Sequence, residues 1–421
     1  MTAMICCCGA KAQGSETGFN EAFADSTLRI DYTLGAERMN PRAMVHRLLK
    51  TPGWAGRRHS LTELPLAGNG QLTLRDAATD SLLYRTSFST LFQEWLATEE
   101  AQTATQSFEH TVLAPLPRRR ALIELTLFDA RRDTMLTISS IYDPADILVQ
   151  RPALPKIPYR YVHRGGDPRD CIDVAILAEG YRAEEMDSFY RRAEEAAREI
   201  LSYEPFREFA DRLNFVAIAS ESRDSGVSVP KQGQWHDTAF GSHFSTFYSD
   251  RYLTTPSVWA VHDAASAAPY EHLIILANTS TYGGGGIYNN YTLTAANVPD
   301  FRPVVVHEFG HSFGGLADEY FYPGDVVEDS YPTDVEPWEP NVTTLVDFGG
   351  KWPSQLKKGT PVPTPIKDKD KYPVGVYEGA AYSTYGVYRP ADQCRMRNNT
   401  YPSLCPVCTA ALRRLIRHAI D

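Results

Sequence analysis

The chain has 421 residues, of which 43% are hydrophobic and 22% are charged, so it is a folded globular protein with enough residues for two domains. Its 42 lysine and arginine residues against 52 aspartate and glutamate residues give a formal net charge of -10, which argues against a nucleic-acid-binding surface. No stretch approaches the roughly 20 apolar residues of a membrane-spanning helix, so we expect no membrane span.

Residues 1–12 predict a truncated signal peptide. A short apolar run over residues 3–10 precedes Ala10-Lys11-Ala12, small residues with the spacing that signal peptidase recognises, and a polar stretch begins at Gln13. The basic segment that normally opens a signal peptide is missing, which we attribute to a start codon recorded inside a longer leader. We therefore expect export; a disordered cytosolic tail is the alternative interpretation.

Residues 27–148 predict an all-β sandwich domain. Apolar and polar residues alternate in short segments separated by Gly, Asn and Asp, which is typical of antiparallel strands with one buried face. These segments are residues 28–33, 72–75, 121–128 and 135–141. No catalytic group stands out in this part of the chain.

A proline-rich segment follows, and it predicts a domain boundary. Residues 151–158 (RPALPKIP) contain three prolines, which favour a stiff, extended connector. We place the linker at residues 149–158 and a second domain at residues 159–421.

The second domain alternates strands with helices, which predicts a mainly parallel sheet covered on both faces. The expected strands are residues 172–177, 213–219 and 272–277, and the expected helices are residues 183–202 and 240–252. Four glycines at residues 283–286 predict a turn into an edge strand over residues 287–294. A phosphate-binding loop is rejected there because no Lys-Ser/Thr pair follows and no helix begins.

Residues 303–320 (PVVVHEFGHSFGGLADEY) carry the strongest signal for chemistry. His307 and His311 are four residues apart, so on a helix both imidazoles project from one face and can reach one Zn²⁺. Glu308 is placed to act on water at the metal, as the general base of a metallopeptidase. The alternative is a partly buried helix with hydrogen-bonded histidines; the apolar run before the motif and the glycine pair after it weaken that alternative.

The third metal ligand follows from counting past the glycine pair. In the HExxHxxGxxH pattern the third ligand lies three residues after the glycine. Counting from Gly314 reaches Ala317, which cannot bind metal, whereas counting from Gly315 reaches Asp318, which can. We expect Asp318 to be the ligand, with Glu319 as the alternative.

Four cysteines remain beyond the predicted signal peptide, and three of them lie close together near the carboxyl end. Cys405-Pro-Val-Cys408 matches half of a zinc knuckle or a redox pair, but no second CxxC is present and only Cys394 lies near. Cys171 is distant in sequence. We expect a disulfide among Cys394, Cys405 and Cys408, or buried thiols.

At residues 307–320 the chain resembles the IgA-specific metallopeptidase family (metallopeptidase family 64), a metzincin-clan group of mostly bacterial secreted proteins. Residues 386–408 (GVYRPADQCRMRNNTYPSLCPVC) are similar to the carboxyl-terminal block of that family, and residues 173–181 (DVAILAEGY) are a weaker likeness. The resemblance spans about residues 158–421. It implies an α/β (α+β) metzincin-like zinc peptidase domain preceded by the all-β sandwich domain.

Residues at and just before the carboxyl-terminal block supply candidates for supporting roles. Metzincins place a methionine on a tight turn beneath the zinc-bound imidazoles, and Met396 is the candidate, with an ordinary core methionine as the alternative. Tyr388, or its neighbours Tyr382 and Tyr385, is expected to hydrogen-bond the tetrahedral intermediate. A closing helix is expected from Pro406 onward, with an apolar stripe that includes Leu412.

The sequence thus predicts a secreted, periplasmic or cell-surface endopeptidase with one catalytic Zn²⁺ held by His307, His311 and Asp318. Its partner would be a protein or peptide substrate, and residues 287–294 are placed to pair with an extended peptide. Two alternatives remain: a surface binding module with a vestigial zinc site, and a zinc hydrolase acting on non-peptide amides. The intact Glu308 argues against a vestigial site.

Overall fold

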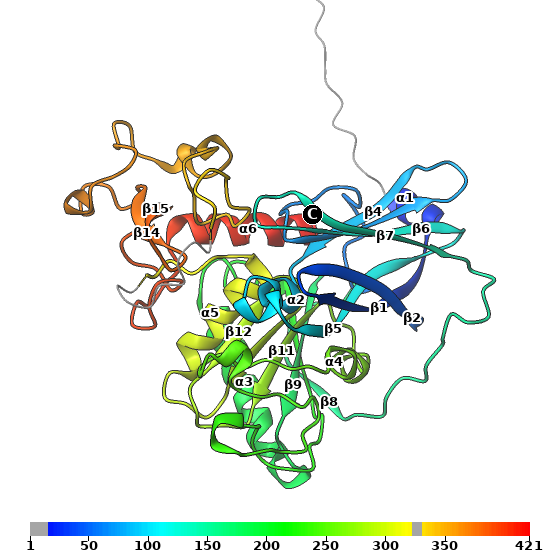
Figure 1. Ribbon diagram of the computed structural model, residues 1–421. Coiled ribbons are helices and arrows are strands. Elements are labelled where there is room, and N and C mark those ends of the chain that lie inside the picture. The colour runs from blue at the N-terminus through cyan, green and yellow to red at the C-terminus, as the bar shows by residue number, and fades with distance from the viewer. Residues whose placement is uncertain (1–15, 322–330) are drawn as a thin grey trace, which may run out of the picture.

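The structure of the chain is a computed structural model that describes residues 16–321 and 331–421 (Figure 1). The predicted signal peptide at residues 1–12 lies outside the described residues. The described strands form four sheets, of three, four, six and two strands. The fold is therefore mixed α/β, with the three- and four-stranded sheets preceding the six-stranded one in the chain.

Two antiparallel sheets make up the N-terminal part. One has the order β2-β1-β5 and the other the order β4-β3-β6-β7. Their strands are β1 (Phe23–Glu37), β2 (Asn40–Pro52), β3 (Gly70–Asp76), β4 (Leu82–Phe88), β5 (Thr105–Pro117), β6 (Ala121–Phe128) and β7 (Thr134–Tyr142). The two sheets share one hydrophobic core, to which β1 contributes Ile30, β3 contributes Leu72 and β6 contributes Leu125. Two sheets joined by such a core form a sandwich.

Alternation of apolar and polar residues explains why these segments are strands with one inner face. Along β6 every second residue is buried, beginning with Ala121. The helices α1 (Glu16–Ala22) and α2 (Leu91–Leu96) lie before β1 and between β4 and β5. Residues 151–158, the proline-rich segment of the expected linker, belong to no helix or strand.

The six-stranded sheet has the order β12-β13-β11-β9-β10-β8. Its four inner strands are parallel to one another, and both edge strands are antiparallel to their neighbours. The strands are β8 (Tyr159–Arg164), β9 (Ile172–Glu179), β10 (Leu213–Ile218), β11 (His272–Ala277), β12 (Gly284–Ile287) and β13 (Tyr291–Ala295). Every residue of β9 is buried, as expected for a strand that is covered on both faces.

Helices cover the two faces of this sheet. From β9, Val174 and Ile176 enter the core that includes α3 (Met186–Ser202), α5 (Phe301–Gly314) and α6 (Pro406–Ile420). Ala175 and Leu177 point to the opposite face and pack with α4 (Val258–Ala265). The helical stretch expected over residues 183–202 and the closing helix expected from Pro406 are thus α3 and α6.

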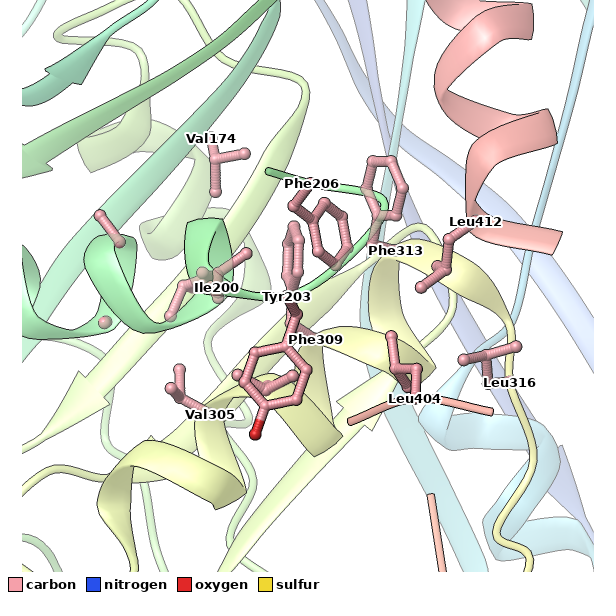
Figure 2. Close-up of a cluster of buried hydrophobic side chains, with 14 of the residues drawn as sticks. Val174, Ile200, Tyr203, Phe206, Val305, Phe309, Phe313, Leu316, Leu404 and Leu412 are labelled. Atoms are coloured by element: carbon pink, nitrogen blue, oxygen red, sulfur yellow. The ribbon is translucent and has the colours of Figure 1, made fainter. Parts of the chain in front are cut away.

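Aromatic side chains fill the core between α5 and the segment after α3. The ring of Phe206 lies 5.5 Å from that of Phe309 and 5.6 Å from that of Phe313. Figure 2 shows these rings in one cluster with Leu412 of α6. This packing holds α5 in place, and with it the side chains on the opposite face of the helix.

Two sequence predictions in this part are wrong. Residues 240–252 form no α-helix: only a 3₁₀ turn occurs, at Thr246–Tyr248, and Ser245, Phe247 and Tyr248 have positive φ values that a right-handed helix excludes. The predicted edge strand over residues 287–294 is also displaced. The glycines themselves form the edge strand β12, and the following strand, β13, is paired on both sides.

The glycines of β12 are required by its contact with α5. A Cβ on Gly286 would lie 2.3 Å from the carbonyl oxygen of Glu308 and 2.8 Å from Cβ of His311. Only glycine therefore allows the sheet edge to lie directly against this helix. Beyond α5 the chain forms the hairpin β14 (Tyr377–Ala380) and β15 (Ser383–Arg389) before α6. Among the described residues, no helix is both long and apolar enough to cross a membrane.

Candidate metal centre

Helix α5 presents two histidines from one face. His307 and His311 lie one turn apart, with ring centroids 4.7 Å apart and their Nε2 atoms 3.0 Å apart. Both belong to a helix whose other side is buried in the aromatic core, so their positions are fixed from behind. The spacing expected from the sequence is therefore realised in the fold.

A left-handed glycine ends the helix and reverses the chain. Gly315 has φ of 56°, and a Cβ there would lie 2.4 Å from Cδ2 of Leu66 and 2.6 Å from Cζ3 of Trp338. Both its conformation and its surroundings therefore require glycine. The reversed chain brings Asp318 back over α5.

Asp318 completes a group of three ligand atoms. Its Oδ1 lies 3.0 Å from Nε2 of His307 and 3.3 Å from Nε2 of His311. For ligands about 2.1 Å from a tetrahedral ion, neighbouring ligand atoms would be about 3.4 Å apart. The three atoms are thus close to the spacing that a single ion needs.

The hydrogen bonds behind the imidazoles decide which nitrogen is available. Nδ1 of His307 donates to the carbonyl oxygen of Arg395 at 3.1 Å, and Nδ1 of His311 donates to that of Leu316 at 2.5 Å. A carbonyl only accepts, so each ring in its neutral form carries its proton on Nδ1 and directs the lone pair of Nε2 toward Asp318. Oδ1 of Asp318 is buried and has no hydrogen-bond donor. Three converging lone pairs of this kind fit a cation.

The charges at the site act on one another strongly. Burial would raise the pKa of Asp318, but the imidazoles of His311 and His307 hold that pKa well below its ordinary value. Burial would lower the pKa of His311, but the carboxylate of Asp318 raises it to about 9. The site therefore holds its negative charge firmly and attracts positive charge.

Glu308 lies beside this group without joining it. It follows His307 on α5, and its Oε1 would be 3.1 Å from a Cβ on Gly284 of β12. Burial raises the pKa of Glu308, and the imidazoles of His307 and His311 offset only part of the rise. A half-buried carboxyl with a raised pKa is suited to exchange protons.

Two tyrosines connect to Asp318 from the other side. The hydroxyl of Tyr382 donates to Oδ2 of Asp318 at 2.7 Å and lies 2.7 Å from the hydroxyl of Tyr320. The ring of Tyr320 is stacked near His307, with centroids 6.3 Å apart. Tyr388, which the sequence favours for this region, instead lies opposite Glu378 in the hairpin, and Tyr385 is 76% exposed.

Met396 packs against α5 at Gly310, which lies between the two histidines in the chain. It is fully buried, and its sulfur would lie 2.7 Å from a Cβ on Gly310. The residue before it, Arg395, supplies the carbonyl that holds His307. Met396 thus packs against the helix that carries both histidines, and its role as a floor beneath the imidazoles stays a prediction.

Glu319, the alternative ligand, turns away from the histidines. Its carboxylate lies among Cys394, Cys405 and Cys408, all buried. The disulfide expected among these cysteines is not formed: the sulfurs of Cys394 and Cys408 are 3.8 Å apart, compared with about 2.05 Å in a disulfide. The thiols surround the Glu319 carboxylate instead of bonding to one another.

One group near the site comes from the N-terminal part of the chain and carried no sequence signal. Glu94 of α2 accepts a hydrogen bond from the hydroxyl of Tyr252. Burial raises the pKa of Glu94 to about 7, while Tyr252 and the charge of His311 act in the opposite direction. Glu94 is more than 200 residues from His311 in sequence, so only the fold reveals this interaction.

Two protein-family models match the chain. The model described as IgA Peptidase M64 matches residues 161–373 and 368–416, and the model described as Peptidase M64 N-terminus matches residues 18–138. The matched segments include both histidines, Glu308, Asp318 and the three clustered cysteines. No curated protein matches the chain.

Proposed function

The chain belongs to the IgA peptidase M64 family and is a metallopeptidase, and we propose that it is a zinc-dependent endopeptidase with its centre at His307, His311 and Asp318. The observation that carries the proposal is that the Nε2 atoms of His307 and His311 converge with Oδ1 of Asp318, an oxygen that accepts no hydrogen bond. Two imidazoles and one carboxylate are a donor set that zinc accepts, with a further position left for water or substrate.

Each residue of the metal centre has a separate role in the proposed reaction. His307, His311 and Asp318 bind the ion, and their orientation comes from the carbonyls of Arg395 and Leu316 and from the hydroxyl of Tyr382. When bound, zinc supplies Lewis acidity and lowers the pKa of water from 15.7 toward about 7.

Glu308 is the proposed general base. Its raised pKa allows it to accept a proton from water and then to donate that proton to the amine of the departing peptide. Its position beside the ligand group, on the same helix, keeps the carboxylate near the reacting atoms without binding the ion.

The substrate is a protein or peptide, as the family implies. We propose that the chain of the substrate approaches along the edge strand β12, because this strand lies against Glu308 and His311. The other side of β12 is partly occupied at Gly284, whose N–H donates to Arg251 and whose carbonyl accepts from Leu253. Pairing with substrate would therefore involve the part of β12 toward Ile287.

The proposal includes a metzincin-like catalytic domain at residues 159–421, joined by the linker at residues 149–158 to a sandwich domain at residues 27–148. The reversal at Gly315, the return of Asp318 and the place of Met396 beneath α5 support the metzincin-like part. Export, guided by residues 1–12, is part of the same proposal. The binding-module alternative is not favoured, because Glu308 would have no use in it.

Zinc analysis together with cleavage of a peptide library tests this function. We expect zinc in the purified protein, cleavage that a chelator abolishes and zinc restores, and a loss of about 10²–10⁴-fold in Glu308→Gln with zinc retained. Glu221→Gln, at an exposed glutamate, is the matched control and should leave cleavage unchanged. Full activity of Glu308→Gln, or of zinc-free protein, would overturn the proposal, whereas cleavage of simple amides but no peptides would favour the non-peptide hydrolase.

A further inference from the structure

A second cluster of metal-binding side chains lies in the interior, next to the site already described but separate from it. Cys394, Cys405, Cys408 and Glu319 each place one ligand atom within 4.8 Å of all the others. All four residues are buried, with exposed fractions between 0% and 2%. Proposed metal chemistry at His307, His311 and Asp318 uses none of them.

The distances within the cluster suit a metal rather than a disulfide. The sulfurs of Cys394 and Cys408 are 3.8 Å apart, which equals the spacing of about 3.8 Å for two thiolates that bind a tetrahedral zinc ion at about 2.3 Å. A carboxylate oxygen of Glu319 lies 3.0 Å from the sulfur of Cys408 and 3.9 Å from that of Cys405. The four ligand atoms therefore surround a common centre.

The backbone around the cluster stabilises thiolates. The N–H of Cys405 points to the sulfur of Cys394 at 3.2 Å, and the N–H of Cys408 points to the sulfur of Cys405 at 3.5 Å. Cys405 is also the N-cap of α6, so its sulfur lies at the positive end of a helix of 15 residues. Cys405-Pro-Val-Cys408 thus has the N–H-to-sulfur contacts and the helix start of a zinc knuckle.

Glu319 is difficult to explain without a ligand. It is 0% exposed; Oε1 accepts from Nδ2 of Asn341 at 3.0 Å, while Oε2 has no hydrogen-bond partner. A buried, half-satisfied carboxyl among three thiols is costly. A cation at the centre of the cluster would remove this cost.

We propose that Cys394, Cys405, Cys408 and Glu319 form a second metal site that binds one Zn²⁺ as a closed, four-coordinate structural site. Three soft sulfur ligands and one carboxylate favour zinc over calcium or magnesium. Four protein ligands leave no position for water or substrate, so this ion would take no part in the reaction. The sequence alone suggested half of such a site; the other half comes from Cys394 and from Glu319, which is 75 residues away in the chain from Cys394.

The second site would position those residues of the catalytic centre that do not belong to α5. Glu319 follows Asp318 directly, and its N–H donates to the carbonyl of Met396 at 2.8 Å. Cys394 precedes Arg395, whose carbonyl accepts from Nδ1 of His307. One ion would thus connect the returning segment that carries Asp318 to the turn that carries Arg395 and Met396, and also to the start of α6.

Metal counting on the full chain tests the proposal. Cys6, Cys7 and Cys8 are replaced by serine in every sample, so that four cysteines remain. We expect about two zinc ions per chain in this parent, about one in His307→Ala/His311→Ala, and about one in Cys405→Ser/Cys408→Ser. Cys171→Ser is the matched control, because Cys171 is a buried thiol outside the cluster, and it should keep both ions.

Cobalt substitution identifies which ion remains. The parent and the double-histidine variant should both show the near-ultraviolet charge-transfer band of cobalt–thiolate bonds, and thiol reagents should react with the clustered cysteines only after the metal is removed. A parent with a single ion that the double-histidine variant loses, or a cobalt form without the thiolate band, would overturn the proposal. A count of two free thiols, instead of four, in the unreduced and denatured parent would also overturn the proposal, because it would reveal a disulfide.

These measurements do not depend on the proposed peptidase mechanism. If the histidine centre bound no metal, the parent would hold one ion and the thiolate band would persist. If the cysteine variant did not fold, the parent and the double-histidine variant would still decide the question.

Discussion

The hydroxyl of Tyr382 donates a 2.7 Å hydrogen bond to Oδ2 of Asp318, the oxygen opposite the one that faces the histidines. Burial raises the pKa of Tyr382 well above its ordinary value, and the Asp318 carboxylate adds to the rise, so the hydroxyl remains a donor at any working pH. The bond orients the carboxylate so that Oδ1 points at both imidazoles. The hairpin β14–β15 thereby takes part in the centre.

Tyr382→Phe should therefore weaken metal binding without unfolding the protein. Loss of a hydrogen bond that orients a ligand typically lowers metal affinity about 10–100-fold. Competition with a chelator of known affinity measures the change. Tyr385→Phe, at a residue that is 76% exposed, is the control. Equal affinities for the two variants would show that Tyr382 does not orient Asp318.

Asp318→Ala and Glu319→Ala should remove metal ions from different sites. Asp318→Ala removes the charged ligand next to the histidines and should abolish both binding there and cleavage. Glu319→Ala should instead weaken the cysteine cluster, where its carboxylate lies. Cobalt spectra distinguish the two, because only the cluster gives thiolate bands. If Glu319→Ala removed the catalytic metal while Asp318→Ala did not, our assignment of the ligand would be off by one residue.

The histidine motif could be predicted from sequence because its geometry is local. Helical spacing alone places His307 and His311 one turn apart, and the pair of glycines at residues 314 and 315 indicates the left-handed turn that ends the helix. The choice between Asp318 and Glu319 depends on the direction of two successive side chains after that turn. Sequence could order the candidates, but only the fold shows which carboxylate faces the histidines.

The parts that sequence missed depend on distant contacts. Cys394 meets Glu319, and Glu94 meets Tyr252, across long stretches of chain that no local pattern relates. Strand β2 was missed because most of its side chains are only partly buried or exposed, which weakens the apolar alternation. Within the falsely predicted helix over residues 240–252, Phe240 and Phe244 are four residues apart, yet they enter the core from an irregular loop.

The packing of Met396 against Gly310 should appear in stability. A Cβ at Gly310 would lie 2.7 Å from the sulfur of Met396, so Gly310→Ala should cost about 1–3 kcal/mol of unfolding free energy through overpacking. Met396→Ala should cost about 2–5 kcal/mol by leaving a cavity.

A double-mutant cycle measured by denaturant unfolding tests this contact. In the double variant the methyl group added by Gly310→Ala has the space that the side chain of Met396 vacated, so the combined cost should be smaller than the sum of the single costs by about 0.5–3 kcal/mol. Additive costs would mean that the two residues do not press on each other.

Metal affinity at the histidine centre should fall as the pH falls. Burial would lower the pKa of His311, but the carboxylate of Asp318 raises it to about 9. Below that pH the metal-free site keeps a proton on His311, and an incoming ion must displace it. The apparent affinity should therefore rise about tenfold per pH unit up to about 9 and level off above it.

Zinc titrations against a chelator between about pH 6 and pH 10, corrected for the protonation of the chelator itself, measure this dependence. Asp318→Asn is the informative variant, because it removes the charge that raises the pKa of His311. Its affinity should be lower, and its pH-dependent range should move to lower pH. Affinity of the unaltered protein that stayed constant from about pH 6 to pH 9 would contradict the prediction, since it would mean that no proton leaves His311 when the metal binds.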